Sequence, residues 1–396
     1  MAVKSLLTAL MTLLVYFFTI SLGNGSVYSW IYGLFLIGIF AAIMYTGKVH
    51  TYRRVFQFVF ALLFTVAFIG NLYDERGSMA MTANTFTESE VPFCHLVIPL
   101  VFIPYVLTQT VVFPARILGH YASIISLLVI WFVATITIGR GWCSWACFYG
   151  GIEDGFSGMR KKPLVKTVAK NREIRAFHFA VLVFLILMTL AFMSSIYCQW
   201  FCPFKLITEF PQLVDIPTLI GTFVFMSLFF LMVVILPLLT KKRTQCSMLC
   251  PFGAMQSLLD KMSMYRVVID TERCTGCMKC AEVCPFFAID RETILENKGH
   301  PEITCAKCGA CVDVCPQQAI RFDFSLTKHF REKNPGKAFL DGPGRLTKIL
   351  REFIEPKYFF VFSAFTFGVV ISSGLAVNGL QRIAEALISA FNLGGM

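Results

Sequence analysis

The chain has 396 residues, of which 56% are hydrophobic and 15% are charged, and its mean hydropathy is +0.68. Soluble globular chains carry about 25% charged residues, so this composition excludes an ordinary soluble domain and favours a membrane protein. The net charge of +11 comes from short basic segments beside apolar runs, which indicates membrane lipid as a partner and no nucleic acid.

Seven apolar runs are long enough to cross a bilayer as helices, which takes about 20 residues. They cover residues 5–22, 27–45, 55–72, 121–138, 177–197, 216–239 and 358–377. An eighth run, residues 94–113, contains Pro99 and Pro104. Because proline removes a backbone donor and kinks helices, we predict that this run is broken or re-entrant and does not cross.

Basic residues between the runs predict the orientation. They are concentrated in residues 48–54, 160–175 and 241–243, which the positive-inside rule places in the cytoplasm. All three segments reach the same side only if residues 94–113 do not cross. We therefore expect a multi-pass protein of the bacterial inner membrane, with the segment between the last two crossing runs in the cytoplasm.

Most of the fifteen cysteines stand in C-x2-C and C-x3-C groups, which is the spacing of metal ligands rather than of disulfides. The motif C-x2-C-x2-C-x3-C-P occurs twice, 31 residues apart. This is the bacterial ferredoxin arrangement, in which the fourth cysteine of each run binds the other [4Fe–4S] cluster. Two zinc sites are the alternative for such pairs, but two complete runs favour iron–sulfur clusters. The predicted ligands are Cys274, Cys277, Cys280 and Cys315 for one cluster, and Cys305, Cys308, Cys311 and Cys284 for the other.

Three further pairs have C-x3-C spacing: Cys143/Cys147, Cys198/Cys202 and Cys246/Cys250. On a helix, residues four apart lie on one face, so each pair can present two thiolates to one metal centre. The predicted orientation puts the first and third pairs at the cytoplasmic edge of the membrane. We expect them to hold a third [4Fe–4S] cluster there, in contact with both membrane and water.

The second pair, Cys198/Cys202, faces the other side in this scheme, with Cys94 near it. Two interpretations stay open: a further cluster completed by a non-cysteine or partner-supplied ligand, or a disulfide if that side is oxidising. Cys94 is equally well explained as apolar filling. Beside the first pair, Glu153 and Asp154 could handle protons at a quinone site, but we expect ordinary solvated charges.

The C-x3-C-P motifs after an apolar run, as in Cys202-Pro203 and Cys250-Pro251, together with the two-cluster ferredoxin, resemble the NapH/NosR/CcoG group of membrane polyferredoxins. The resemblance covers roughly residues 117–324. It implies electron transfer between a quinol pool or cytoplasmic donor and a partner redox protein. The chain departs from the group at Phe148, where proline is usual, which weakens the ligand role of the first pair. It also has no large flavin-binding domain of the NosR kind.

The expected fold is mainly α: a polytopic transmembrane helical domain with an inserted cytoplasmic α+β domain of the two-[4Fe–4S] ferredoxin type. We place the transmembrane domain at residues 1–266 and the ferredoxin domain at 267–324. A basic linker is expected at 325–356, followed by a last transmembrane helix and an interfacial helix at 357–396.

No nucleophile triad, paired carboxylates or phosphate-binding loop stands out, so we expect an electron-transfer subunit rather than a free-standing catalyst. The leading hypothesis is a relay to a quinone or to a partner redox subunit. The alternative is an assembly factor that reduces a metal or disulfide for a terminal oxidase or reductase, with Cys198 and Cys202 acting on the substrate. A redox sensor ranks last because no output domain is visible.

Overall fold

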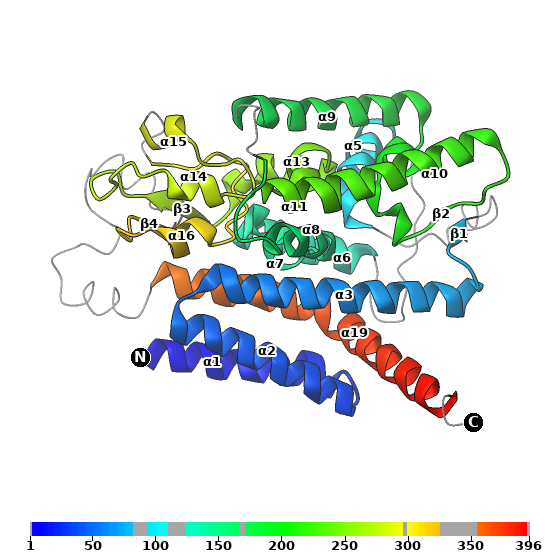
Figure 1. The fold of residues 1–396 in the computed structure, drawn as a ribbon, viewed down its shortest axis with the longest axis horizontal. Coiled ribbons are helices and arrows are strands. Elements are labelled where there is room, and N and C mark those ends of the chain that lie inside the picture. The colour runs from blue at the N-terminus through cyan, green and yellow to red at the C-terminus, as the bar shows by residue number, and fades with distance from the viewer. Residues whose placement is uncertain are drawn as a thin grey trace.

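The computed structural model describes residues 2–81, 94–109, 124–165, 171–295, 299–324 and 355–393 (Figure 1). The side chains of residues 124–127 are outside this description. Almost all of the predicted basic linker, residues 325–354, also lies outside the described residues.

The N-terminal part forms three long helices. Helix α1 (Ala2–Val15) continues as a π-helix to Ser21, and α2 (Val27–Thr46) and α3 (Val49–Arg76) follow. Ser26 caps α2, because its side-chain oxygen accepts from the backbone N–H of Ser29 at 3.1 Å. Gly47, at φ +72°, ends α2 in the left-handed conformation that glycine adopts without a steric cost. These two caps set the short turns between the first three helices.

The last helix, α19 (Pro356–Leu393), packs along α3. A Cβ at Gly379 would lie 2.0 Å from the carbonyl oxygen of Leu63, so glycine is needed for this close approach. The structure differs here from the predicted separate interfacial helix, because one continuous helix of 38 residues covers both segments. No proline interrupts it after Pro356, and Gly368 and Gly379 lie where α19 packs closely on α3.

The middle of the chain consists of long helices joined by short helices that turn back into the bundle. The long ones are α9 (Asn171–Phe192) and the run from α10 (Ile216–Leu228) through a π-helix, Phe229–Ile235, into α11 (Leu236–Thr240). The short ones are α5 (Ile98–Thr108), α6 (Ile124–Thr137), α7 (Trp142–Trp145), α8 (Phe148–Gly158), α12 (Thr244–Met248) and α13 (Pro251–Leu259).

Among the described residues, six helices are long and apolar enough to cross a membrane. A seventh span results if Leu128–Thr137 and Gly139–Trp145 are counted together, although they meet at 118°. Six of the predicted runs correspond to the six helices, and the run at 121–138 corresponds to the bent pair. Helix α5 has 11 residues, about 16 Å at 1.5 Å per residue. This is too short for a hydrocarbon core of about 30 Å. Pro99 lies in the first turn of α5 and Pro104 inside it, so neither proline breaks the helix; residues 110–113 of this run lie outside the described residues.

The ferredoxin domain is a small α+β unit at one end of the molecule (Figure 1). Strand β3 (Tyr265–Ile269) pairs antiparallel with β4 (Ile320–Phe324), with Tyr265 opposite Phe324. Between them lie the short helices α14 (Lys279–Val283), α15 (Arg291–Leu295) and α16 (Ala310–Val314). The opposite end of the molecule carries the two-residue parallel pair β1 (Ala80–Met81) and β2 (Phe210–Pro211).

The basic segments of the sequence lie at the ferredoxin end. The carboxylate of Asp313 accepts from the backbone N–H groups of Val49 and His50, at 3.2 and 2.7 Å. The ammonium of Lys242 donates to three carbonyl oxygens at the end of α14, including that of Cys284 at 2.7 Å. The starts of α3 and α12 therefore hold the ferredoxin domain directly against the helical domain.

Candidate iron–sulfur sites

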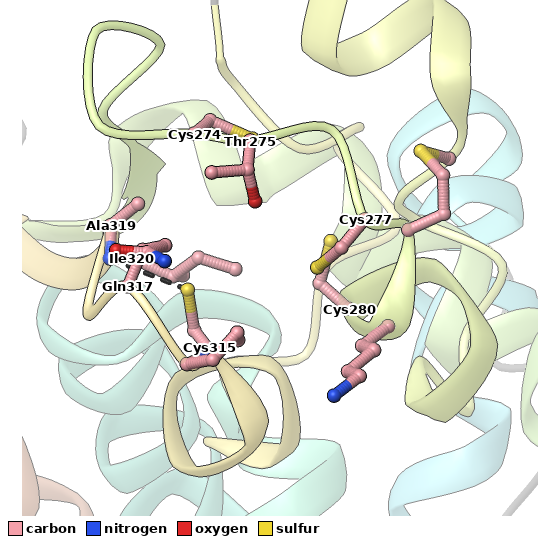
Figure 2. Close-up of a pocket in the computed structure, with 11 residues that line it drawn as sticks. Cys274, Thr275, Cys277, Cys280, Cys315, Gln317, Ala319 and Ile320 are labelled. Atoms are coloured by element: carbon pink, nitrogen blue, oxygen red, sulfur yellow. Dashed lines mark hydrogen bonds between the residues drawn. The ribbon is translucent and has the colours of Figure 1, made fainter.

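The eight ferredoxin cysteines line two separate cavities. The first has an empty volume of about 340 Å³, and its lining includes Cys274, Cys277, Cys280 and Cys315 (Figure 2). The second has an empty volume of about 300 Å³, and its lining includes Cys284, Cys305, Cys308 and Cys311. Each cavity thus receives three cysteines from one run and the fourth from the other, which is the exchange that the ferredoxin spacing predicts.

The fourth cysteine of each run has a distinctive backbone geometry. Cys284 and Cys315 each follow a short helix, with φ/ψ of −67°/112° and −70°/111°. The sulfur of Cys284 accepts from the N–H of Ala288 at 3.4 Å, and that of Cys315 accepts from the N–H of Ala319 at 3.3 Å. Backbone donors of this kind stabilise thiolates and raise the potential of a cluster bound to them.

The first and third membrane pairs come together in the helical domain. Cys143 lies on α7 and Cys246 on α12, while Cys147 and Cys250 stand at the N-caps of α8 and α13. Burial raises the pKa of the Cys250 thiol, and the neighbouring Cys143 and Cys147 thiols raise it further. The structure thus gathers the four thiols that the orientation argument grouped.

Two details of this group of four cysteines, here called the four-thiol site or membrane site, differ from the prediction. Neither pair lies on one helical face, because the chain leaves the helix between the two cysteines and the second one starts a new helix. The site also lacks the predicted contact with water: the four thiol residues are 3–5% exposed and belong to the hydrophobic core. The short helices α7, α8, α12 and α13 turn inward and bury them.

The two halves of the four-thiol site are related by a sequence repeat that was not recognised from the sequence. Each pair reads R-x2-C-x3-C-x2-G, from Arg140 to Gly150 and from Arg243 to Gly253. The guanidinium of Arg140 donates to the carbonyl oxygen of Cys246 at 3.3 Å, and that of Arg243 donates to the carbonyl oxygen of Cys143 at 2.9 Å. Each arginine thereby fixes the first cysteine of the other pair. An arginine three residues before the first and third C-x3-C pairs was the signal in the sequence.

The glycines of this repeat allow the close crossing of the two halves. A Cβ at Gly150 would lie 2.1 Å from Nη2 of Arg243, and one at Gly253 would lie 2.8 Å from the carbonyl oxygen of Cys246. Their N–H groups donate to the sulfurs of Cys147 and Cys250, at 3.4 and 3.3 Å. Phe148 does not disturb this geometry, because Cys147 before it has φ/ψ of −80°/113° and Cys250 before proline has −76°/112°.

The charge and the free donors of the site suit an anionic cluster. Arg140 and Arg243 are fully buried, and Nε and Nη1 of both have no hydrogen-bond partner among the described residues. Buried donors in proteins are normally paired, and a [4Fe–4S] cluster with four thiolates brings negative charge and sulfide acceptors. Nη2 of Arg243 also lies 3.2 Å from the sulfur of Cys246. The donor set therefore fits an iron–sulfur cluster at these four thiols.

Glu153 and Asp154 are not the solvated charges that the sequence led us to expect, since both are fully buried on α8. The carboxylate of Glu153 accepts from the backbone N–H groups of Gln245 and Cys246, at 2.7 and 3.2 Å. Asp154 forms an ion pair with Arg53 at 2.8 Å. The two carboxylates hold the site together from within the core.

Arg53 connects the four-thiol site to the ferredoxin domain. Its Nε donates to the carbonyl oxygen of Cys308 at 3.2 Å, and its Nη1 donates to the carbonyl oxygen of Ser144 at 2.8 Å. The indole of Trp145 donates to the carbonyl oxygen of Lys307 at 3.3 Å. The loops around Cys143 and Cys308 are therefore in direct contact through buried side chains.

A separate group of three thiols, those of Cys94, Cys198 and Cys202, lies outside the four-thiol site. Cys94 and Cys198 both pack against Val97. His95 follows Cys94, and its Nε2 lies 3.3 Å from the sulfur of Cys147. The predicted neighbourhood of Cys94 to the second pair is present, and none of the fifteen cysteines is in a disulfide.

Two sequence families described as 4Fe-4S binding domains match the chain. One covers residues 267–290, the first ferredoxin run. The other matches three times, at residues 120–166, 175–215 and 222–266, so each match contains one C-x3-C pair. Each of the three pairs thus lies in a segment that is similar to one kind of iron–sulfur domain.

The chain is also similar in sequence to proteins named as ferredoxin-type or electron transport proteins. The ferredoxin-type protein NapH of Escherichia coli is 27% identical over 191 residues, which are 47% of this chain and 62% of NapH. The chain is therefore similar to ferredoxin-type proteins of the NapH kind over about half of its length. The methylamine utilization ferredoxin-type protein MauN of Methylobacillus flagellatus is 31% identical over 149 residues, 37% of this chain and 48% of MauN.

The putative electron transport protein YccM of Escherichia coli is 25% identical to this chain over 170 residues, 42% of this chain and 46% of YccM. The matched region therefore spans about half to three fifths of these relatives. No solved structure matches the chain. Helices that can cross a membrane, together with iron–sulfur domain matches, support a multi-pass membrane protein with an electron-transfer role.

Proposed function

We propose that the chain relays electrons between the two ferredoxin clusters and a third cluster held by Cys143, Cys147, Cys246 and Cys250. Clusters at these thiols would supply reversible one-electron chemistry. The observation that carries the proposal is the reciprocal contact of Arg140 and Arg243 across the two pairs, with Arg53 joining that site to the Cys308 loop.

The protein's part in this relay is to fix the sites and set their potentials. Aromatic and aliphatic side chains exclude water around the four buried thiols. Phe286, two residues after Cys284, lies under both guanidinium groups, 5.4 Å from Arg140 and 4.7 Å from Arg243. These contacts keep the ferredoxin domain in one position against the membrane site.

The orientation is part of the proposal. The basic segments at the starts of α3 and α12 adjoin the ferredoxin domain, and the positive-inside rule assigns such segments to the cytoplasm of a bacterial cell. We therefore infer a cytoplasmic ferredoxin domain in the inner membrane. Protease added to inverted membrane vesicles, which expose the cytoplasmic face, should cleave this domain. Protease added to intact spheroplasts, which expose the opposite face, should leave it intact.

The deciding experiment is the content of iron and acid-labile sulfide per chain in anaerobically purified protein, with EPR of the reduced sample. Four irons per cluster give about eight for the ferredoxin domain alone and about twelve or more with the membrane site. A value near eight would confine the clusters to the ferredoxin domain and reject the relay.

The partner at the far end of the relay is a quinone or a partner redox subunit. The relatives' names, ferredoxin-type and methylamine utilization ferredoxin-type, support a redox partner for this chain as well. A quinone would show as reoxidation of the reduced protein by a water-soluble quinone analogue in detergent. If the quinone analogue does not speed reoxidation above the rate measured without it, a partner subunit is left as the acceptor.

The assembly-factor alternative would use Cys198 and Cys202, which belong neither to the ferredoxin cavities nor to the four-thiol site. It requires these thiols to exchange with a substrate, so they should react with a thiol reagent in the fully loaded protein. Protection of both thiols until iron is removed would exclude it.

A further inference from the structure

Cys94, Cys198 and Cys202 form a cysteine group that neither the ferredoxin domain nor the four-thiol site uses. Eight of the fifteen cysteines line the ferredoxin cavities and four form the membrane site, which leaves these three. They come from two parts of the chain, the start of the short helix before α5 and the turn after α9. We propose that they hold a fourth iron–sulfur cluster through three thiolates, which leaves one iron without a cysteine of this chain.

The backbone at Cys202 is the first observation behind this proposal. Its φ/ψ of −77°/107° matches those of Cys147 and Cys250 in the membrane site. Like Cys250, it precedes a proline that begins a helical turn. The chain thus presents the thiol of Cys202 in the same way as the other cysteines that end a C-x3-C motif.

The surroundings of the group are the second observation. Cys94 and Cys198 both pack against the buried side chain of Val97, and Cys202 stands four residues after Cys198. Lys205 is 6% exposed, and its backbone N–H donates to the carbonyl oxygen of Cys202 at 3.3 Å. A buried lysine beside these cysteines supplies the positive charge that a set of thiolates needs in an apolar surrounding.

The residues that flank Cys198 and Cys202 differ from those that flank the cysteines of the four-thiol site. Arg140 and Arg243 stand three residues before the first cysteine of their pairs, but Ser195 stands before Cys198. Gly150 and Gly253 stand three residues after the second cysteine, but Lys205 follows Cys202. The second pair therefore lacks the arginine and glycine that let two pairs cross and fix one another, and Cys94 completes it instead.

The position of the group extends the relay proposed above, on which this inference rests. The sulfur of Cys94 lies 3.9 Å from the hydroxyl of Tyr149, which follows Cys147 by two residues. The ring of Tyr149 packs on that of Phe204 with 4.1 Å between centroids. With His95 against Cys147, side chains connect the two sites without a gap. The iron with no cysteine would then be the point where the chain hands electrons to an external ligand or partner.

Iron analysis of the full-length protein and of Cys94→Ala tests the inference. Four clusters of four irons predict about sixteen irons for the parent and about twelve for the variant. Mild oxidation of the parent should release one iron per chain and give the EPR signal of a [3Fe–4S] cluster, which Cys94→Ala should lack. Val101→Ala, which alters an apolar neighbour of the same group, should behave like the parent.

Two results would overturn the inference. About twelve irons in the parent, with three thiols that react or form a disulfide after denaturation, would show that the group holds no cluster. About sixteen irons in Cys94→Ala would show that Cys94 is not a ligand. Both outcomes leave the four-thiol site and the relay intact, because the signal of that site is identified separately by its loss in Cys143→Ser.

Discussion

The guanidinium of Arg243 donates to the carbonyl oxygen of Cys143 at 2.9 Å, and the guanidinium of Arg140 returns the contact at Cys246. Each half of the membrane site is therefore positioned by a cation that belongs to the other half. Since both arginines are buried and keep unpaired N–H groups, they act on the charge of the site as well as on its shape.

Arg140→Gln should lower the reduction potential of the cluster at this site, because it removes a positive charge that favours the added electron. We expect at least a tenfold change in the one-electron equilibrium, which corresponds to about 59 mV. EPR-monitored redox titration measures it, with Arg273→Gln on the exposed ferredoxin surface as control. An unchanged potential at full occupancy would contradict the assignment.

Cys143→Ser and Cys246→Ser should have the same spectroscopic effect, although they lie on different helices. If both residues bind one cluster, each variant loses the same EPR signal and about four irons. The signals of the ferredoxin clusters should persist in both. Loss of different signals in the two variants would mean that the pairs serve separate centres.

Gly150→Ala should prevent assembly of the membrane site, because the added Cβ would lie 2.1 Å from the Arg243 guanidinium and 2.5 Å from the carbonyl oxygen of Cys143. Gly38→Ala on α2 is the matched control, since a Cβ there meets nothing within 4 Å. The control should gain roughly 0.5–1 kcal/mol of stability from helix propensity. Iron content separates the two variants, and a fully loaded Gly150→Ala protein would argue against the crossing.

Arg53→Met should destabilise the protein by roughly 3–5 kcal/mol, because it leaves the fully buried carboxylate of Asp154 without its partner. The same change removes the bonds to Cys308 and Ser144, so the ferredoxin domain should become susceptible to limited proteolysis. Arg54→Met is the control, since Arg54 is partly exposed and 3.5 Å from Asp154. Equal melting temperatures of the two variants would count against the role of Arg53.

Cysteine spacing and the distribution of basic residues predicted which cysteines the structure brings together. The two ferredoxin runs assigned the lining of each cavity, and the charge count grouped Cys143 with Cys246 although 103 residues separate them. The described part of the run at 94–113 forms only the short helix α5, but Pro104 lies inside that helix and does not end it. Ligand spacing is a strong signal because it acts locally and does not depend on packing.

Burial was not predictable in the same way. Glu153 and Asp154 look like surface charges in the sequence, and their burial depends on Arg243 and Arg53, which are brought in by other helices. The interfacial helix expected after the last span is not a separate element, because the apolar run and the residues after it form the single helix α19. A residue's partners across the bundle decide such cases.

The two membrane cysteine groups alternate along the chain, with Cys94 first, then the pair at Cys143, then the pair at Cys198, and last the pair at Cys246. The group of Cys94 is complete only at residue 202, and the four-thiol site only at residue 250. The four thiols therefore cannot meet before residue 250 has been synthesised and its helix inserted. Under the proposed cluster assignment, iron delivery to the membrane part follows these steps, and the cell must keep seven thiols reduced until the bundle has closed around them.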